Sequence, residues 1–199
     1  DPLHPGNSVA GAALAFGAGA RAHFDLTKVK SVLAVDSNFL VEGPDHLRLA
    51  KQWAQGRKSK SVDEARSMNR LYAVEGALTA TGASADHRVR LSSAGAAMFL
   101  KGVVAELAKS GSVVNGVWGA APPPGTEKMV AAVAKDLLAG GLVLVGERQP
   151  PAVHALGHAI NVALGAMASG ALVVTQGTDA IAAGSLAELK KALDDKAVE

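Results

Sequence analysis

The segment from Ser31 to Leu40 constrains the fold most, because it joins an unbroken apolar run to a short polar turn. Strands that are buried on both faces of a parallel sheet have this continuous apolar pattern, whereas half-exposed strands alternate apolar and polar residues. In α/β proteins, ligands bind just beyond the carboxyl ends of such strands. Asp36, Ser37 and Asn38 therefore lie where the chemistry of such a fold is concentrated.

Four short apolar runs predict strands, and each is followed by glycine or polar residues. They cover residues 31–36, 71–75, 142–145 and 171–175. Helical patterns lie between them, and the connections are too long for hairpins, which favours βαβ units with right-handed crossovers. We therefore expect a three-layer, Rossmann-like α/β fold in which helices flank a mostly parallel sheet. With 199 residues and 49% hydrophobic content, the chain is expected to form a single domain over residues 1–199.

The sequence also predicts where the flanking helices begin and which faces they bury. Asn7 or Ser8 is expected to cap a first helix that ends near Phe16. A helix from residues 150–151 is expected to continue to about Met167. A further helix opens at residues 43–45 and is predicted to bury one face, made of Leu47, Ala50, Trp53 and Ala54.

Local patterns predict several further features. Ser92 or Ser93 is expected to cap a helix, and the charged segment 57–68 is expected to be a solvated surface connection. Trp118 lies in a proline-rich connector and is predicted to dock on the core or on a partner. Residues 185–188 have the spacing of a capping box, which marks the start of a last helix.

Composition excludes several classes of function. The formal net charge is only +2, and basic and acidic residues are interspersed. The sequence has no stripe of basic and aromatic residues, so no nucleic-acid partner is predicted. The chain has no cysteine, which excludes disulfides, thiolate-bound zinc, cysteine-ligated iron–sulfur clusters and cysteine nucleophiles within it. No stretch approaches the roughly 20 apolar residues of a membrane span. Because the sequence starts without methionine, we expect a mature product or a piece of a longer protein.

The turn after the first predicted strand offers a carboxylate, a hydroxyl and an amide within three residues, as a nucleotide-binding or pterin-binding loop would. No glycine-rich phosphate-binding signature accompanies it. The alternative is a structural turn in which Asp36 and Asn38 bond local backbone groups. Glu75 and Glu147 follow strand ends and are candidate bases, but nothing in the sequence pairs either with a substrate.

Two histidine-containing patterns also qualify as candidate sites. His154 and His158 stand four residues apart, so one face of a helix could present both to a metal ion, but no third ligand is evident. The alternative is that both rings bond backbone groups at a helix edge or a subunit contact. Asp86 precedes a histidine, and an ion pair of this carboxylate with Arg88 or Arg90 is the favoured interpretation. No catalytic set and no metal ligands are assigned.

Taken together, several segments resemble one known family, the molybdopterin-oxidoreductase-like region of the large iron–sulfur subunit of alternative complex III. That complex is a bacterial, membrane-bound quinol:electron-acceptor oxidoreductase. The similarity extends over most of the chain and keeps the order and spacing of its motifs. The segments that carry it are residues 32–40 (VLAVDSNFL), 43–45 (GPD), 68–75 (MNRLYAVE), 79–88 (TATGASADHR) and 149–156 (QPPAVHAL).

The resemblance implies a non-catalytic scaffold that keeps the fold of a molybdopterin oxidoreductase domain without its metal cofactor. It implies that the iron–sulfur clusters lie in another part of a longer parent protein, which continues beyond this chain. It further implies contacts with that cluster-bearing part and with other subunits, at the periplasmic face of the bacterial inner membrane. A vestigial cofactor cleft would be lined by Asp36, Ser37, Asn38, Glu75, Gly146 and Gln149. The alternative is a pterin- or nucleotide-binding oxidoreductase domain that uses the same cleft at the strand ends.

Overall fold

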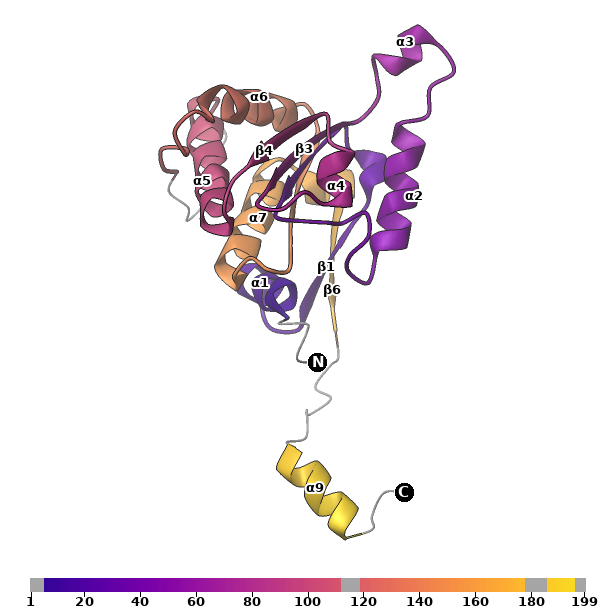
Figure 1. The fold of residues 1–199 in the computed structure, drawn as a ribbon, viewed down its shortest axis with the longest axis vertical. Coiled ribbons are helices and arrows are strands. Elements are labelled where there is room, and N and C mark those ends of the chain that lie inside the picture. Colours follow the sequence, from indigo (N-terminus) through magenta and orange to yellow (C-terminus); the bar gives the residue numbers. More distant parts are fainter. Residues whose placement is uncertain (1–5, 112–118, 178–185, 196–199) are drawn as a thin grey trace.

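The computed structural model describes residues 6–111, 119–177 and 186–195, and its centre is a four-stranded parallel sheet (Figure 1). The strand order is β4-β3-β2-β5, with every neighbouring pair parallel. The strands are β2 (Ser31–Val35), β3 (Arg70–Glu75), β4 (His87–Arg90) and β5 (Gly141–Val145). Helices flank this sheet on both faces, so the predicted three-layer, Rossmann-like α/β fold is confirmed.

Two strands form a separate antiparallel ribbon, β1 (Ala20–Phe24) with β6 (Leu172–Gln176). The last strand was predicted to join the others in βαβ units, and that prediction is wrong, because β6 pairs with β1 alone. An apolar run shows that a strand is buried but does not identify its partner. Strands β1 and β4 were not predicted from the sequence. Strand β4 is four residues long and carries three basic side chains, so it lacks an apolar run.

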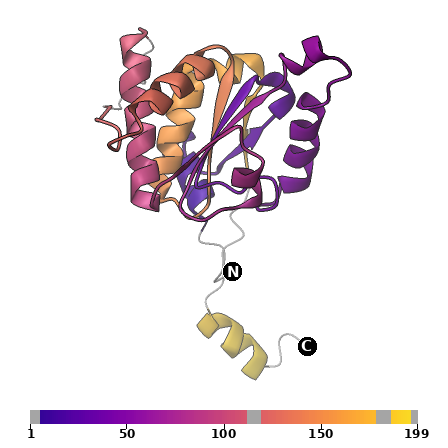
Figure 2. The same ribbon diagram turned by 45° about the horizontal axis from the view of Figure 1, so that its top comes forward.

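Several of the helices form the outer layers, which Figure 2 shows on either side of the sheet. A short 3₁₀ helix, η1 (Leu26–Lys28), precedes β2. None of the helices in the described ranges is long and apolar enough to cross a membrane. The α-helices are α1 (Asn7–Phe16), α2 (His46–Gly56), α3 (Val62–Ala65), α4 (Ala80–Ala83), α5 (Ser93–Lys109), α6 (Glu127–Leu138), α7 (Pro151–Ala163), α8 (Ala166–Ser169) and α9 (Leu186–Asp194).

The alternation of side chains along each strand divides the core into two halves. Leu33 and Val35 face a cluster that includes side chains of α5, α6 and α7. Val32 and Ala34 face the opposite cluster, which includes Trp53 of α2 together with side chains from η1, α8 and β6. Every residue of β2 is buried. In a central strand that is covered on both faces, no side chain points to solvent, which explains the unbroken apolar run.

Several predicted helix details need correction. Gly6, not Asn7 or Ser8, is the N-cap of α1. In α2, the buried residues are Leu49 and Trp53, whereas Leu47 is 77% exposed, so the predicted apolar face was rotated away from the true one.

The predicted helix from residue 150 to Met167 is interrupted at Gly165, whose φ of 75° lies in the left-handed region, so α7 and α8 are separate. Ser92 does cap α5, since its Oγ accepts from the amide of Gly95. Trp118 and Ser185 lie outside the described residues, and so do the side chains of residues 186–188.

Asn161 of α7 closes the outer side of strand β5. Its Oδ1 accepts from the amide of Val143 at 2.7 Å, and its Nδ2 donates to the carbonyl of Val143 at 2.8 Å. Both bonds are buried, so the side chain imitates the next strand of the sheet. We expect Asn161→Ala to lower the free energy of unfolding by about 2 kcal/mol, because a buried donor and acceptor lose their partners. Urea denaturation measures this loss, and an unchanged midpoint would contradict it.

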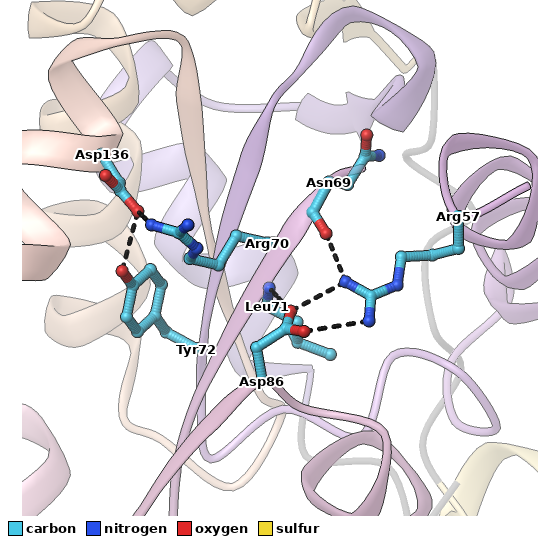
Figure 3. Close-up of polar contacts among 7 residues, drawn as sticks. All are labelled: Arg57, Asn69, Arg70, Leu71, Tyr72, Asp86 and Asp136. Atoms are coloured by element: carbon cyan, nitrogen blue, oxygen red, sulfur yellow. Dashed lines mark hydrogen bonds and ion pairs between the residues drawn. The ribbon is translucent and has the colours of Figure 1, made fainter. Parts of the chain in front are cut away.

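Two polar clusters join the amino-terminal half of β3 to its neighbours (Figure 3). On one side, Asp136 of α6 accepts from Arg70 at 2.6 Å and from the Tyr72 hydroxyl at 2.7 Å. On the other, both carboxylate oxygens of Asp86 bond Arg57 at 2.9 Å. Burial works to raise the pKa of Asp86, but the bonds from Arg57 and the Leu71 amide outweigh it and hold the pKa below its usual range. These clusters connect α2 and α6 to the sheet at the end opposite the candidate site.

Candidate functional site

The order of the strands defines where a ligand site of this fold would lie. The chain runs from β2 outward through β3 to β4 and then returns through α5 and α6 to β5, on the other side of β2. The direction of winding therefore reverses between β2 and β5. Ligands of open α/β sheets bind at such a switch point, beyond the carboxyl ends of the strands. Asp36 follows β2 and Gly146 follows β5, so both stand at this position.

Asp36 is the centre of a hydrogen-bonded group at the switch point. Its Oδ2 accepts from the Ser93 hydroxyl at 2.5 Å and from Nε2 of Gln149 at 3.0 Å. The same Gln149 nitrogen donates to the carbonyl of Ser93 at 3.0 Å, and Gln149 is only 1% exposed. Asp36 has a φ of 51°, the only positive value among the described residues other than glycine. Aspartate tolerates this region better than most side chains do.

Gly146 allows the ends of β2 and β5 to approach closely. Its amide donates to the carbonyl of Val35 at 2.9 Å. A Cβ atom at Gly146 would lie 1.8 Å from the carbonyl oxygen of Asp36 and 2.8 Å from the Cα of Ser37. Neither neighbour is the flexible end of a side chain, so the space between the two strand ends is filled by backbone.

We expect Gly146→Ala to lower the free energy of unfolding by about 1 to 3 kcal/mol, since the added methyl group forces the two strand ends apart. Denaturation by urea measures the loss. Gly76→Ala is the matched control, because Gly76 is exposed, has no positive φ, and its added Cβ would meet only the Leu91 carbonyl oxygen, at 3.3 Å. An unchanged stability of Gly146→Ala would show that the strand ends can separate without cost.

Asn38 joins the turn after β2 to α4. Its Oδ1 accepts from the amide of Thr81 at 3.2 Å, and the Thr81 hydroxyl accepts from the amide of Leu40 at 3.2 Å. Its Nδ2 donates to Glu42 at 3.0 Å. The alternative of a structural turn predicted that Asp36 and Asn38 bond local backbone groups. In the structure, the hydrogen-bond partners of these two side chains come mostly from distant segments. Ser37 is nearly buried beside them.

Glu75, at the end of β3, forms a second group. Its side chain is 3% exposed and pairs with Nε of Arg88 at 2.6 Å, while its Oε2 accepts from the Thr79 hydroxyl at 2.7 Å. A Cβ atom at Gly82 would lie 1.7 Å from its Oε1, so the carboxylate packs directly on α4. Arg88 therefore pairs with Glu75, and the predicted ion pair of Asp86 with Arg88 or Arg90 is replaced by one with Arg57.

The six predicted cleft residues thus stand at the carboxyl edge of one sheet. Asp36 and Gln149 are bonded to each other, Gly146 lies against Asp36, and Asn38 and Glu75 both contact the α4 segment. That they are the remnant of a cofactor cleft stays a prediction. Glu147, a candidate base, contacts the start of α1, where its carboxylate accepts from the amide of Ser8.

His154 and His158 line a different cavity, between α1, β1 and α7. Both are buried, and each has one ring nitrogen without a hydrogen-bond partner, Nε2 of His154 and Nδ1 of His158. The described residues contain no group of three or more His, Asp or Glu side chains arranged to hold a metal ion. Burial lowers the pKa of His154 below its usual range, although the charge of Glu147 and the backbone of Gly146 and Gln149 work to raise it. That the two rings bond backbone groups stays a prediction.

The sequence did not show which residues bond Asp36, Asn38 and Glu75. Ser93 was a candidate helix cap, and Thr79 and Thr81 lie in the polar segment 79–88, but only the fold brings them to these partners at the strand ends. The cavity depends on β1, whose sequence alternates Ala20, Ala22 and Phe24 with polar residues. That alternation is the signal of a half-buried strand and could have revealed it. Comparison of the chain with models of protein families and with curated protein sequences gives no match.

Proposed function

We propose that this chain is a non-catalytic scaffold domain of a respiratory complex that oxidises quinol. The sequence resemblance to the large iron–sulfur subunit of alternative complex III suggests it. The observation that carries it is the filled switch point, where Asp36, Ser93 and Gln149 bond one another at the position of an α/β ligand site. Binding of a pterin at this edge would require these bonds to break. The polar groups at the strand ends therefore stabilise the fold.

The glycines at this edge support the same proposal. An open crevice leaves space beside its glycines, so that a ligand can approach the backbone closely. At Gly146 and Gly82 that space is taken by the chain itself, by the Asp36 backbone and the Glu75 carboxylate. Neither the cavity beside α1 and β1 nor the groove between α1 and α7 is lined by Asp36 or Glu75.

Under this proposal the domain supports a cluster-bearing part of its parent protein and contacts other subunits at the periplasmic face of the bacterial inner membrane. An apolar groove between α1 and α7 supports a role in such contacts. At its margin Leu14 is 66% exposed and Met167 is 48% exposed. Contiguous exposed apolar surface of this kind marks protein–protein contacts more often than free surface.

Elemental analysis and pterin assay of the purified 199-residue chain test the proposal. We expect far less than one molybdenum atom per chain and no pterin released on oxidative denaturation. A molybdenum enzyme produced in the same host is the positive control for cofactor supply. Stoichiometric molybdenum or pterin would overturn the scaffold proposal in favour of a cofactor-binding oxidoreductase domain, and saturable nucleotide binding in equilibrium dialysis would do so too.

A further inference from the structure

The groove between α1 and α7 is an apolar surface that the described part of the chain leaves open. Its volume is about 730 Å³, and Lys101 is the only charged residue among those that line it. Leu14 and Met167 stand at its margin and are 66% and 48% exposed. Keeping apolar surface of this kind in water costs free energy, so we expect another apolar element to cover the groove.

Alanines form the α7 side of this groove. Ala152, Ala155, Ala159 and Ala163 line it, and their spacing of three and four residues repeats along one face of the helix. Such small side chains allow a second helix to approach closely and to place larger side chains between them. At 1.5 Å per residue, the alanine stripe is about 16 Å long. The groove therefore has the shape and length to receive a helix of two to three turns.

Helix α9 has the complementary pattern. Positions 186, 189 and 193 are leucines, and their spacing places them on one face of a helix, whereas positions 188, 190, 191 and 194 are charged. In the structure, Leu193 is 54% exposed. With nine residues, α9 is shorter than the roughly 12 residues at which an isolated helix becomes even marginally stable in water. The helix therefore needs an apolar surface on which to pack.

The path of the chain shows which groove α9 can reach. The chain leaves the domain after β6 at Gly177, whose amide donates to the carbonyl of Gly19 at 2.8 Å. Gly19 is three positions beyond Phe16, which lines the groove. Figure 1 shows α9 beyond the β1–β6 ribbon, apart from α1 and α7 of its own chain. The eight residues 178–185 span at most roughly 30 Å, which is enough to bring α9 to an adjacent molecule.

We propose that two copies of this chain exchange their α9 helices, so that each α9 lies in the α1–α7 groove of the other copy. Because each chain leaves its domain beside its own groove, one twofold axis near this point brings both helices to both grooves. The leucines of α9 then meet the alanine stripe of α7, and its charged positions stay in water. The inference goes beyond the scaffold role proposed above and does not depend on it.

Sedimentation equilibrium of the 199-residue chain tests the proposal, and we expect the mass to rise to that of a dimer with increasing protein concentration. Leu193→Lys in α9 and Leu14→Lys in the groove are each expected to weaken the dimer at least about 100-fold, because each change removes a leucine from both halves of the interface. Both side chains are exposed in the single chain, so both variants are expected to fold. Leu47→Lys is the matched control, since Leu47 is 77% exposed on α2, and it should leave the dimer unchanged.

A mixture of the two variant chains separates helix exchange from other kinds of association. In a mixed pair, the groove of the Leu193→Lys chain and the α9 of the Leu14→Lys chain are both intact. One of the two helix–groove contacts can therefore form, and we expect the mixture to contain more dimer than either variant alone. A mixture that stays as monomeric as its components would contradict the exchange.

Introduced cysteines identify the surfaces that meet, because the chain has none of its own. We expect a disulfide-linked heterodimer when chains with Ala155→Cys in the groove are oxidised together with chains with Ala192→Cys in α9. Chains with Ala54→Cys, at an exposed position of α2, replace the groove variant as the control and should link far more slowly. An internal disulfide in a monomer that carries both Ala155→Cys and Ala192→Cys would overturn the proposal, because α9 would then occupy its own groove. A chain that stays monomeric at every concentration, or a dimer that is insensitive to Leu193→Lys, would overturn it too.

Discussion

Replacing Arg88 by methionine is expected to lower the free energy of unfolding by about 3 to 5 kcal/mol, because it leaves a buried carboxylate without its cation. Glu75 is 3% exposed at its side chain, and Arg88 is 26% exposed. The remaining bonds from the amide and hydroxyl of Thr79 cannot neutralise the charge. Chemical denaturation measures the loss, with an unchanged slope showing that the unfolded state is the same.

Arg66→Met is the matched control for this change. Arg66 forms an ion pair with Asp63 at 3.8 Å, but its side chain is 79% exposed and that of Asp63 is 92% exposed. Exposed pairs of this kind contribute little to stability, so the variant is expected to unfold at the same urea concentration as the unmodified chain. The double variant Arg88→Met, Glu75→Gln should be less destabilised than the sum of its single changes, since no charge is left buried. Equal losses in the Arg88 and Arg66 variants would contradict the argument.

The parts of the fold that could be predicted are those in which burial requires apolar residues. Strands β2, β3 and β5 lie in the middle of the sheet or under helices on both faces, so the residues between their ends are nearly all apolar and stand out from their surroundings. Strand β4 is largely exposed at the edge of the sheet and carries basic residues, so no local pattern distinguishes it from a loop. Helix α2 shows a similar limit, because Leu47 is apolar and exposed, and a single such residue shifts the apparent apolar face.

The position of the candidate site could also be predicted from the sequence, but whether side chains close it could not. The apolar run that ends at Val35 locates the carboxyl end of a central strand, and Asp36 does stand at the switch point. The residues that close that point, Ser93 and Gln149, lie 57 and 113 positions from Asp36 in the sequence. Their roles follow from how α5 and α7 begin over the strand ends. That is a tertiary property with no signature of its own in the sequence.

The stability of the chain is expected to fall by about 3 kcal/mol as the pH decreases from 6.5 to 4, because of His158. Burial, together with the neighbouring His154, lowers the pKa of His158 from 6.5 to about 4. Between these two values the unfolded chain binds a proton that the folded chain does not, so acid favours unfolding, and below about pH 4 both states are protonated and the loss is complete. A difference of about 2.5 pH units at 1.36 kcal/mol each gives the magnitude. His154, whose pKa is lowered chiefly by burial, adds to the effect in the same direction.

The pH window separates the histidines from the carboxylates. Asp25, Asp86 and Asp136 have pKa values below their usual value of 3.8, so the stability that they contribute is lost only as the pH falls below that value. Urea denaturation of the unmodified chain and of His158→Asn at pH 7.5, 5.5 and 4.5 measures the difference. The variant should lose most of the slope between pH 6.5 and 4, while His46→Asn, at a partly exposed histidine of α2, should retain it. If the unfolding free energy of His158→Asn still changes with pH in this window as much as that of the unmodified chain, other groups cause the change. The reason is that the substituted amide does not titrate and the unfolded states differ only at that one position.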